Sequence, residues 1–439
     1  IIAGPGTGKT RTLTHRIAHL IASHGATPEQ CLAITFTNRA AREMRDRLEQ
    51  LLPGSAARIP VMTFHALGHS ILRQHADTLG LPASFRVANE AEAKAVLSET
   101  LKASGRQAAE DGEAYQKAMR ARGLVDFDDL IRLPLDLLAS HPELLTAYRE
   151  RYRWISVDEF QDIDEDQYRL IRLLASADGN LCVIGDPDQA IYGFRGTDGL
   201  CFERFAQDFA GARTVELTWN YRSGKGILGA SLQIVAPASR VEDRVLQALS
   251  EDDTKVVIHE SPTDKAEAEF VTHTIERLIG GSTFFSMDSR RVDAGEEGSW
   301  SFSDFAVLYR TDAQAAALVE ALARSGMPFQ KRSHVPLAEA PSVREITAVM
   351  QDMDGALTPA QRLDRASMGL PPEARLAAQA LRPIAARCRD TESFLSELAM
   401  ASDADLWDPR AEAISLLTLH ASKGLEFPVV FIAGVEDGL

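Results

Sequence analysis

Cysteine is scarce in this 439-residue sequence, and long apolar runs are missing. The longest apolar runs, such as residues 427–435, are much shorter than the roughly 18 to 20 residues that cross a bilayer as a helix. The four cysteines are isolated and show no CxxC or Cys/His spacing, which argues against a zinc site, an iron–sulfur cluster or a disulfide framework. We therefore predict a soluble protein with buried, reduced thiols at Cys31, Cys182, Cys201 and Cys388.

Positive charge is also in deficit, with 47 Lys and Arg against 63 Asp and Glu and a formal net charge of −16. Non-specific coating of nucleic acid is driven by cations that neutralise phosphates, so this balance argues against it. Any nucleic-acid site must therefore be a local groove. The sequence has no evident internal repeat, and its length and hydrophobic content of 45% allow two or more domains, each with its own core.

Short apolar segments alternate with helical patterns, which is typical of α/β folds with parallel sheets and crossover helices. Strands are predicted in a first series at 31–36, 59–64, 154–160 and 180–186, and in a second at 215–221, 255–260, 304–310, 414–420 and 427–435. We predict two nucleotide-binding domains, each with a helical insertion rich in Ala, Leu, Glu and Arg. The boundaries are 1–84 with 146–212 for the first domain, 85–145 for its insertion, 213–333 with 413–439 for the second domain and 334–412 for its insertion.

Residues 3–10 read AGPGTGKT, a phosphate-binding loop with Ala3 where the strict pattern has its first glycine. In such a loop the backbone N–H groups surround the phosphates, Lys9 places its charge on the β and γ groups, and the Thr10 hydroxyl can bind Mg²⁺. A chance Gly-rich turn is the alternative, but helical periodicity follows the loop at once. The candidate ATP-binding residues are Gly4, Gly6, Thr7, Gly8, Lys9, Thr10 and Arg11.

Two adjacent acids, Asp158 and Glu159, close the strand predicted at 154–160. A nucleotide-hydrolysing site needs a carboxylate that holds the metal and a base that orients water, both at the carboxyl end of a neighbouring strand. Adjacent acids alone are more often a solvated turn or a helix cap. Together with the loop at 3–10, they indicate that Asp158 holds Mg²⁺ and that Glu159 polarises the attacking water.

Three other strand ends carry amide, hydroxyl and aromatic groups. Gln189 follows the strand at 180–186 and could sense a γ-phosphate, and aromatic side chains at such edges can stack on bases. Turn and cap roles are the alternatives. The candidate nucleic-acid contacts are Phe36, Thr63, Phe64, His65, Tyr192, Phe194 and Arg195.

Arg222 lies in WNYRS, at the start of the predicted second domain. From there it could reach across a cleft and neutralise charge on the γ-phosphoryl group, as an arginine finger does. An exposed arginine is otherwise usually just solvated.

Seven motifs in this order resemble those of superfamily 1 helicases of the UvrD/Rep/PcrA type: GPGTGKT, AITFTNRAAREM, TFHALGHSIL, VDEFQD, VIGDPDQAIYGFRG, LTWNYRS and TLHASKGLEFPVVFIAGVEDG. The resemblance covers almost the whole chain. It implies two RecA-like P-loop NTPase domains with ATP and Mg²⁺ between them, each with a helical insertion. It also implies a DNA-stimulated ATPase that moves 3′ to 5′ on single-stranded DNA and unwinds duplex DNA.

The resemblance also implies roles by motif position. Lys9, Thr10, Asp158 and Glu159 would bind MgATP and catalyse its hydrolysis, Gln189 would sense the γ-phosphate, and Arg222 would be the finger. Tyr221 would stack near the adenine, and Glu426 would meet the nucleotide sugar. The aromatic strand ends, Arg195 and His420 would contact or couple to DNA.

The chain departs from the family pattern in several places. It lacks the upstream glutamine segment that reads adenine and the final motif with its second arginine, and Phe194 stands where many relatives have Trp. Both insertions are short for the family. We therefore expect residues 1–439 alone to bind MgATP weakly, to show little DNA-stimulated ATPase and to unwind no duplex.

Three other interpretations compete with a DNA-repair, replication-restart or recombination helicase. The chain could be the motor of an RNA helicase or of a recombination helicase–nuclease, a scaffold or fragment that only binds nucleotide, or a P-loop ATPase that acts on proteins. The expected partners are single-stranded DNA and junctions of single- and double-stranded DNA, and no membrane. The resemblance implies a bacterial-type, cytoplasmic, nucleoid-associated protein, while the loading partner stays open.

Overall fold

The computed structural model divides into two compact units, Ile1–Val257 and Ile258–Leu439, and each is described by itself. The structure describes residues 1–104, 112–176, 179–193, 200–241, 243–252, 254–280, 300–333, 335–353 and 357–436. Among these residues, every helix is too short or too polar to span a membrane. The fold class is α/β with parallel sheets, as predicted.

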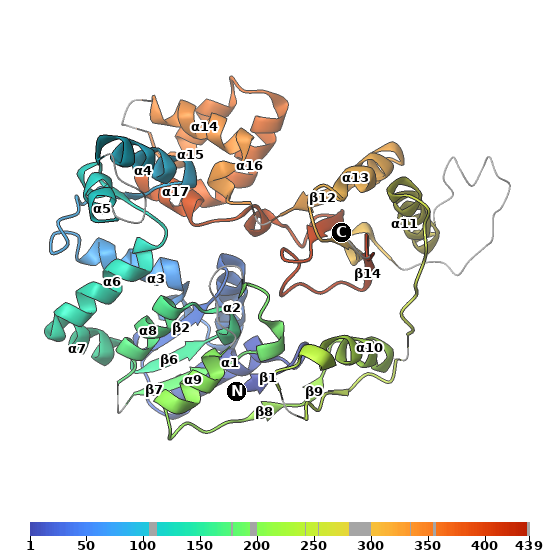
Figure 1. The fold of residues 1–439 in the computed structure, drawn as a ribbon, viewed down its shortest axis with the longest axis horizontal. Helices are drawn as coiled ribbons and strands as arrows, with labels where there is room; N and C mark the ends of the chain where they lie inside the picture. Colours follow the sequence, from blue (N-terminus) through green and yellow to red (C-terminus); the bar gives the residue numbers. More distant parts are fainter. Residues whose placement is uncertain are drawn as a thin grey trace. The chain divides into compact units, whose positions relative to one another are not determined.

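The first unit is built on a parallel sheet with the strand order β3-β2-β6-β7 (Figure 1). A bridge between Ile2 and Gly185 places β1 beside the end of β7, and β1 pairs in turn with β8. The bounds are β1 (Ile2–Ala3), β2 (Cys31–Thr35), β3 (Val61–Thr63), β6 (Trp154–Val157), β7 (Asn180–Val183), β8 (Glu216–Leu217), β9 (Trp219–Asn220) and β10 (Gln247–Ala248).

Helices cover both faces of this sheet, because successive side chains of a strand point to opposite faces. On β2, Cys31 and Ala33 join one buried cluster, whereas Leu32 and Ile34 join the other. The helices of this unit are α1 (Lys9–Ser23), α2 (Asn38–Leu51), α3 (Phe64–Gln74), α4 (Glu90–Ser104), α5 (Gly112–Ala121), α6 (Asp129–Ser140), α7 (Pro142–Arg151), α8 (Glu165–Leu174), α9 (Cys201–Asp208) and α10 (Lys225–Val235).

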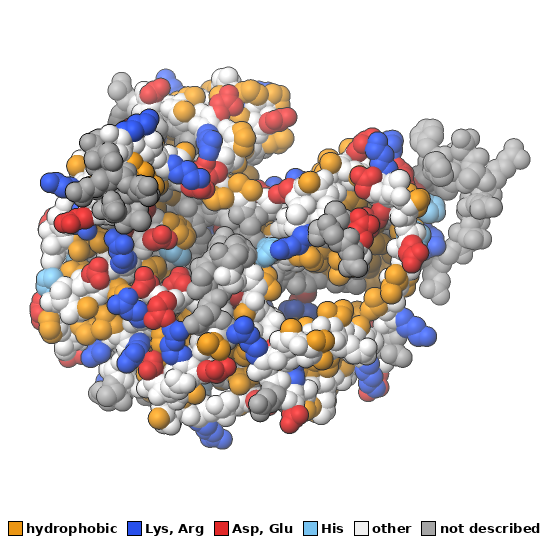
Figure 2. Space-filling view, viewed as in Figure 1, with side chains coloured by type: hydrophobic (Ala, Val, Ile, Leu, Met, Phe, Trp, Pro, Cys, Tyr) orange, Lys and Arg blue, Asp and Glu red, His pale blue; other side chains and the backbone are white. Residues whose placement is uncertain are grey.

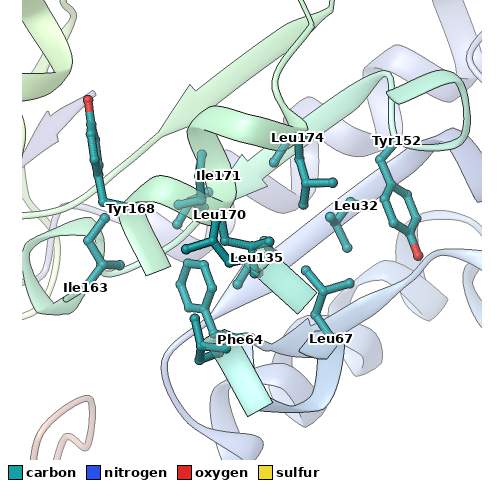
Figure 3. Packing of buried hydrophobic residues seen from close by; sticks show 14 of the residues in the cluster. Leu32, Phe64, Leu67, Leu135, Tyr152, Ile163, Tyr168, Leu170, Ile171 and Leu174 are labelled. Carbon is teal, nitrogen blue, oxygen red and sulfur yellow. The ribbon is translucent and has the colours of Figure 1, made fainter. Parts of the chain in front are cut away.

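Helix α6 falls within the insertion predicted at 85–145, but it packs on α3 and α8 of the first unit's core. Figure 3 shows Leu135 of α6 beside Phe64 and Leu67 of α3, in the cluster that also holds Leu32. The rest of the insertion is mainly helical, with one two-stranded parallel sheet formed by β4 (Arg86–Val87) and β5 (Leu124–Val125).

The second unit holds a parallel sheet with the order β12-β13-β11-β14. Its elements are α11 (Asp264–Ile279), β11 (Phe305–Tyr309), α13 (Ala315–Arg324), β12 (Phe329–Arg332), β13 (Ile414–Thr418) and β14 (Val429–Ile432). The insertion predicted at 334–412 is helical, with α14 (Pro341–Gln351), α15 (Pro359–Ser367), α16 (Pro372–Arg387) and α17 (Thr391–Ala399) around a separate hydrophobic cluster.

Two sequence-based expectations, one strand and the burial of the thiols, differ from the structure. The strand predicted at 255–260 is wrong, because this segment pairs with no strand in the described structure and leaves Val257 and Ile258 83% and 88% exposed. The first compact unit runs on to Val257 because β8 pairs with β1, and the predicted domain boundary at 212 stays a prediction. Cys31 and Cys201 are buried free thiols, whereas Cys182 and Cys388 are only half-buried.

Gly68 lets α3 approach α6 closely: a Cβ at this position would lie 1.7 Å from the carbonyl oxygen of Leu130. We expect Gly68→Ala to lower the free energy of unfolding by about 1 to 3 kcal/mol, because the backbone of α6 would have to shift. Gly229→Ala in α10 is the matched control, since nothing lies within 4 Å of its Cβ position. It should leave stability unchanged or raise it by up to about 1 kcal/mol. Urea unfolding followed by circular dichroism tests both, and equal effects would contradict the close-packing argument.

Candidate ATP and DNA sites

The phosphate-binding loop follows β1 and leads directly into α1, which begins at Lys9. Gly6 and Gly8 have φ values of 67° and 84°, in the left-handed region that favours glycine. The Thr7 hydroxyl donates to the carbonyl of Gly4 at 2.8 Å and braces the turn. The loop therefore presents the N-terminus of a 15-residue helix, where backbone N–H groups can bind an anion.

The end of one strand, β6, brings an oxygen ligand to this loop. The Thr10 hydroxyl donates to Asp158 Oδ2 at 3.1 Å, and Asp158 follows β6. Asp158 is 3% exposed, and burial raises its pKa to about 7, with repulsion from Glu159 adding to the rise and Lys9 opposing it. A divalent cation beside this carboxylate would favour its ionised form. The hydroxyl and carboxylate fit Mg²⁺, which is usually held by one or two carboxylates together with substrate phosphates.

Glu159 is held in an uncommon backbone conformation, with φ at 51°. Such strain concentrates at functional sites, where surrounding contacts maintain it. The carboxylate of Glu159 accepts a hydrogen bond from the amide of Gln161, a fully buried residue. The Gln161 oxygen in turn accepts from the backbone N–H of Asp186 at 3.0 Å. The acid pair and the loop after β7 are thus joined through one buried amide.

Gln189 lies beside Lys9. The Lys9 ammonium donates to Gln189 Oε1 at 3.4 Å, and Gln189 Nε2 donates to Asp186 Oδ2 at 2.6 Å. The carboxamide is therefore held from both ends, with its oxygen toward the lysine of the phosphate loop.

Residues 219–223 pack on the phosphate loop within the first compact unit. Asn220 is 1% exposed, and its Nδ2 donates to the carbonyl of Pro5 at 2.7 Å. The backbone N–H of Tyr221 donates to the carbonyl of Gly6 at 2.9 Å. A Cβ on Gly6 would lie 2.7 Å from Arg222 Cβ, so only glycine fits beneath this segment.

Arg222 lies beside the phosphate loop within the first compact unit, and its expected approach to the γ-phosphoryl group stays a prediction. The pairing of β8 with β1 brings this segment, with the Cβ of Arg222, close to the loop. The neighbouring Tyr221 ring is 61% exposed. Arg11 is exposed on the first turn of α1.

The candidate DNA contacts fall into three groups. Phe64 and Tyr192 are 3% and 1% exposed, so their rings are buried in this structure, and their expected contact or coupling to DNA stays a prediction. Phe64 belongs to the hydrophobic core, and Tyr192 stacks on Phe36 with ring centroids 4.7 Å apart. Thr63 caps α3 by accepting from the N–H of Ala66.

His65 is the second group. It stacks on Phe127 with ring centroids 3.8 Å apart, and Phe127 is 40% exposed. Sequence reasoning missed Phe127, which lies in the helical insertion and carries no pairing signal. The third group is Phe194 and Arg195, which lie outside the described residues.

His420 and Glu426 belong to the second unit. His420 receives a hydrogen bond from Arg310 at 3.1 Å, and Glu426 is exposed. Their expected meeting with DNA and nucleotide stays a prediction.

The "UvrD/REP helicase N-terminal domain" matches residues 1–112 and 102–210, and the "UvrD-like helicase C-terminal domain" matches residues 215–354 and 379–439. The chain belongs to the UvrD/Rep helicase family.

Relatives in this family align along the whole chain. Proteins named ATP-dependent DNA helicase PcrA from Staphylococcus aureus strain Mu50 and from Leuconostoc citreum are each 28% identical. The alignments cover 100% of this chain and 76% and 75% of those proteins. The two UvrD-family domains meet between residues 210 and 215, whereas packing extends the first compact unit to Val257.

Asn220 and Gln161 also hold segments of the candidate site together, although the sequence did not single them out. Each acts through buried amide hydrogen bonds between segments far apart in the chain, and a lone amide residue carries no such signal.

The donor role of Asn220 can be tested. Asn220→Asp would place a carboxylate oxygen against the Pro5 carbonyl, and we expect it to lower the free energy of unfolding by about 1 to 3 kcal/mol. Asn180→Asp is the control, because the Asn180 side chain accepts from Arg16 through Oδ1 and an aspartate would keep that bond. Thermal unfolding compares the two. A loss no larger for Asn220→Asp than for Asn180→Asp would refute the role.

Proposed function

We propose that this chain is the motor of an ATP-dependent DNA helicase. One observation carries the proposal: Lys9 with Gln189, and Thr10 with Asp158, form two hydrogen-bonded pairs at one edge of the first unit's sheet. The family and the printed names of the relatives supply the substrate, DNA. We further propose movement 3′ to 5′ on single-stranded DNA, action at junctions with duplex DNA, and a cytoplasmic role in repair, replication restart or recombination.

The chemistry follows from these positions. Lys9 and the N-terminus of α1 would neutralise the β- and γ-phosphates, while Thr10 and Asp158 would hold Mg²⁺. The bound Mg²⁺ would offset charge on the phosphate oxygens. Glu159 orients the attacking water, and the oxygen of Gln189 faces the same region. Arg222 supplies further positive charge from the segment that packs on the loop.

His65 and Phe127 support a DNA contact near the carboxyl end of β3. A partly exposed aromatic pair can stack on a base of any sequence, as a translocating motor requires. In Figure 2, Lys and Arg side chains are interspersed with Asp and Glu over the visible face and do not form one large basic patch. This charge distribution favours binding of single-stranded DNA in a local groove over binding across a broad basic surface.

The catalytic assignment predicts loss of turnover. In the full-length protein, Lys9→Ala and Glu159→Gln should each lower DNA-stimulated ATP hydrolysis by about 100-fold or more, because each removes a charged group that the transition state needs. Arg169→Ala is the control, since it removes only an exposed ion pair with Asp166. A coupled ATPase assay with single-stranded DNA measures the rates. Near-normal turnover in either site variant would contradict the proposal.

The stacking assignment predicts weaker DNA binding. Phe127→Ala should reduce affinity for single-stranded DNA by about 1 to 3 kcal/mol, whereas Phe127→Tyr keeps the ring and should bind almost normally. ATP hydrolysis without DNA should not change in either variant. Fluorescence anisotropy with a labelled oligonucleotide gives the affinities. Equal affinity for the Ala and Tyr variants would show that Phe127 only packs against His65.

A further inference from the structure

Arg244 is an almost buried cation that none of the recognised motifs contains. Its side chain is 11% exposed and forms ion pairs with two aspartates of the loop after β7. Arg244 Nη2 lies 2.6 Å from Asp186 Oδ1, and Nη1 pairs with Asp188. The two aspartate side chains are only 1% and 2% exposed.

The guanidinium also lies beside the phosphate loop. A Cβ on Gly4 would be 3.2 Å from Arg244 Nη2 and 2.7 Å from Leu246 Cδ1. Burying three charged groups is costly unless each is paired and hydrogen-bonded, and a hydrophobic contact could close the same gap without that cost. The arrangement therefore calls for a role besides packing.

That role is suggested by the second oxygen of Asp186. Oδ1 pairs with Arg244, while Oδ2 accepts from Gln189 Nε2 at 2.6 Å. A carboxamide can face either way, and a carboxylate on one side accepts only from its NH₂ end. Asp186 thus turns the oxygen of Gln189 toward Lys9, where the two lie 3.4 Å apart.

We infer that Arg244 is a positioning residue for Gln189: it holds the Asp186 carboxylate in the orientation that directs the Gln189 oxygen toward Lys9 and the reacting phosphate. This inference rests on the proposed function, in which Gln189 responds to the γ-phosphate. Arg244 would act on Gln189 through the Asp186 carboxylate that both side chains contact.

Asp186 and Asp188 provide a matched pair for the test. Both pair with Arg244, but Asp188 otherwise binds the Ser239 hydroxyl and the Arg240 N–H, whereas Asp186 holds Gln189. A purely structural clamp would need both aspartates alike. A positioning role needs Asp186 more than Asp188.

The experiment uses the full-length protein with saturating single-stranded DNA. Arg244→Gln should lower kcat for ATP by about 10-fold or more, within the range of a displaced catalytic group, while KM and the affinity for a fluorescent non-hydrolysable ATP analogue change by less than about 3-fold. Arg244→Lys should recover part of the loss. Asp186→Asn should reproduce the fall in kcat, and Asp188→Asn should not.

A double-mutant cycle shows whether Arg244 acts through Gln189 or independently of it. In a Gln189→Ala background, Arg244→Gln should lower kcat by less than about 2-fold further, because the group that it positions is already gone. Independent, multiplying effects would overturn the inference, as would equal losses in Asp186→Asn and Asp188→Asn. If Arg244→Gln does not fold, the comparison of the two aspartates decides. Turnover that survives Lys9→Ala would refute the proposed function, whereas turnover that is sensitive to Lys9→Ala and insensitive to Arg244→Gln would refute only the inference.

Discussion

The parallel pairing of β1, β2, β6 and β7 is the constraint on which the first unit depends. Strands that run in the same direction deliver their carboxyl ends to one edge, and the segments after them must meet there. The phosphate loop follows β1, Asp158 follows β6, and Asp186 follows β7. The bridge between Ile2 and Gly185 sets the spacing between the loop and Gln189. Lys9 and Gln189 are 180 positions apart in the sequence, and this pairing brings them together.

Several carboxylates lie at that edge, and their mutual repulsion is reduced by groups beside them. Asp158 is buried beside Glu159, and its raised pKa reflects burial first and the neighbouring carboxylate second. Thr10 and Lys9 partly compensate this charge, and a bound cation would compensate the rest. Asp186 and Asp188 are compensated differently, by the guanidinium of Arg244. At this edge, the Asp158 carboxylate is suited to a metal, whereas Asp186 and Asp188 are already paired with Arg244.

For the aromatic residues at strand ends, the sequence pattern did not distinguish buried rings from exposed ones. Phe36, Phe64, His65 and Tyr192 all follow strands, so the pattern assigned them to one exposed edge. Burial separates them: Phe64 turns into the core, Tyr192 lies beneath Phe36, and His65 finds Phe127. An aromatic ring gains stability both by core burial and by stacking on a base, and its position in the sequence does not distinguish the two.

The sequence by itself determined the fold class, the strands that carry the phosphate loop and the acid pair, and the family. Those features depend on local patterns, because a Gly-rich turn, a short run of β-forming residues and a helical periodicity can each be recognised within a short segment of sequence. Only the tertiary structure decided that residues 219–223 pack on the phosphate loop, that Arg244 pairs with two aspartates, and that residues 255–260 form no strand. These outcomes depend on pairing between distant segments, and a strand exists only where a neighbour supplies its hydrogen bonds.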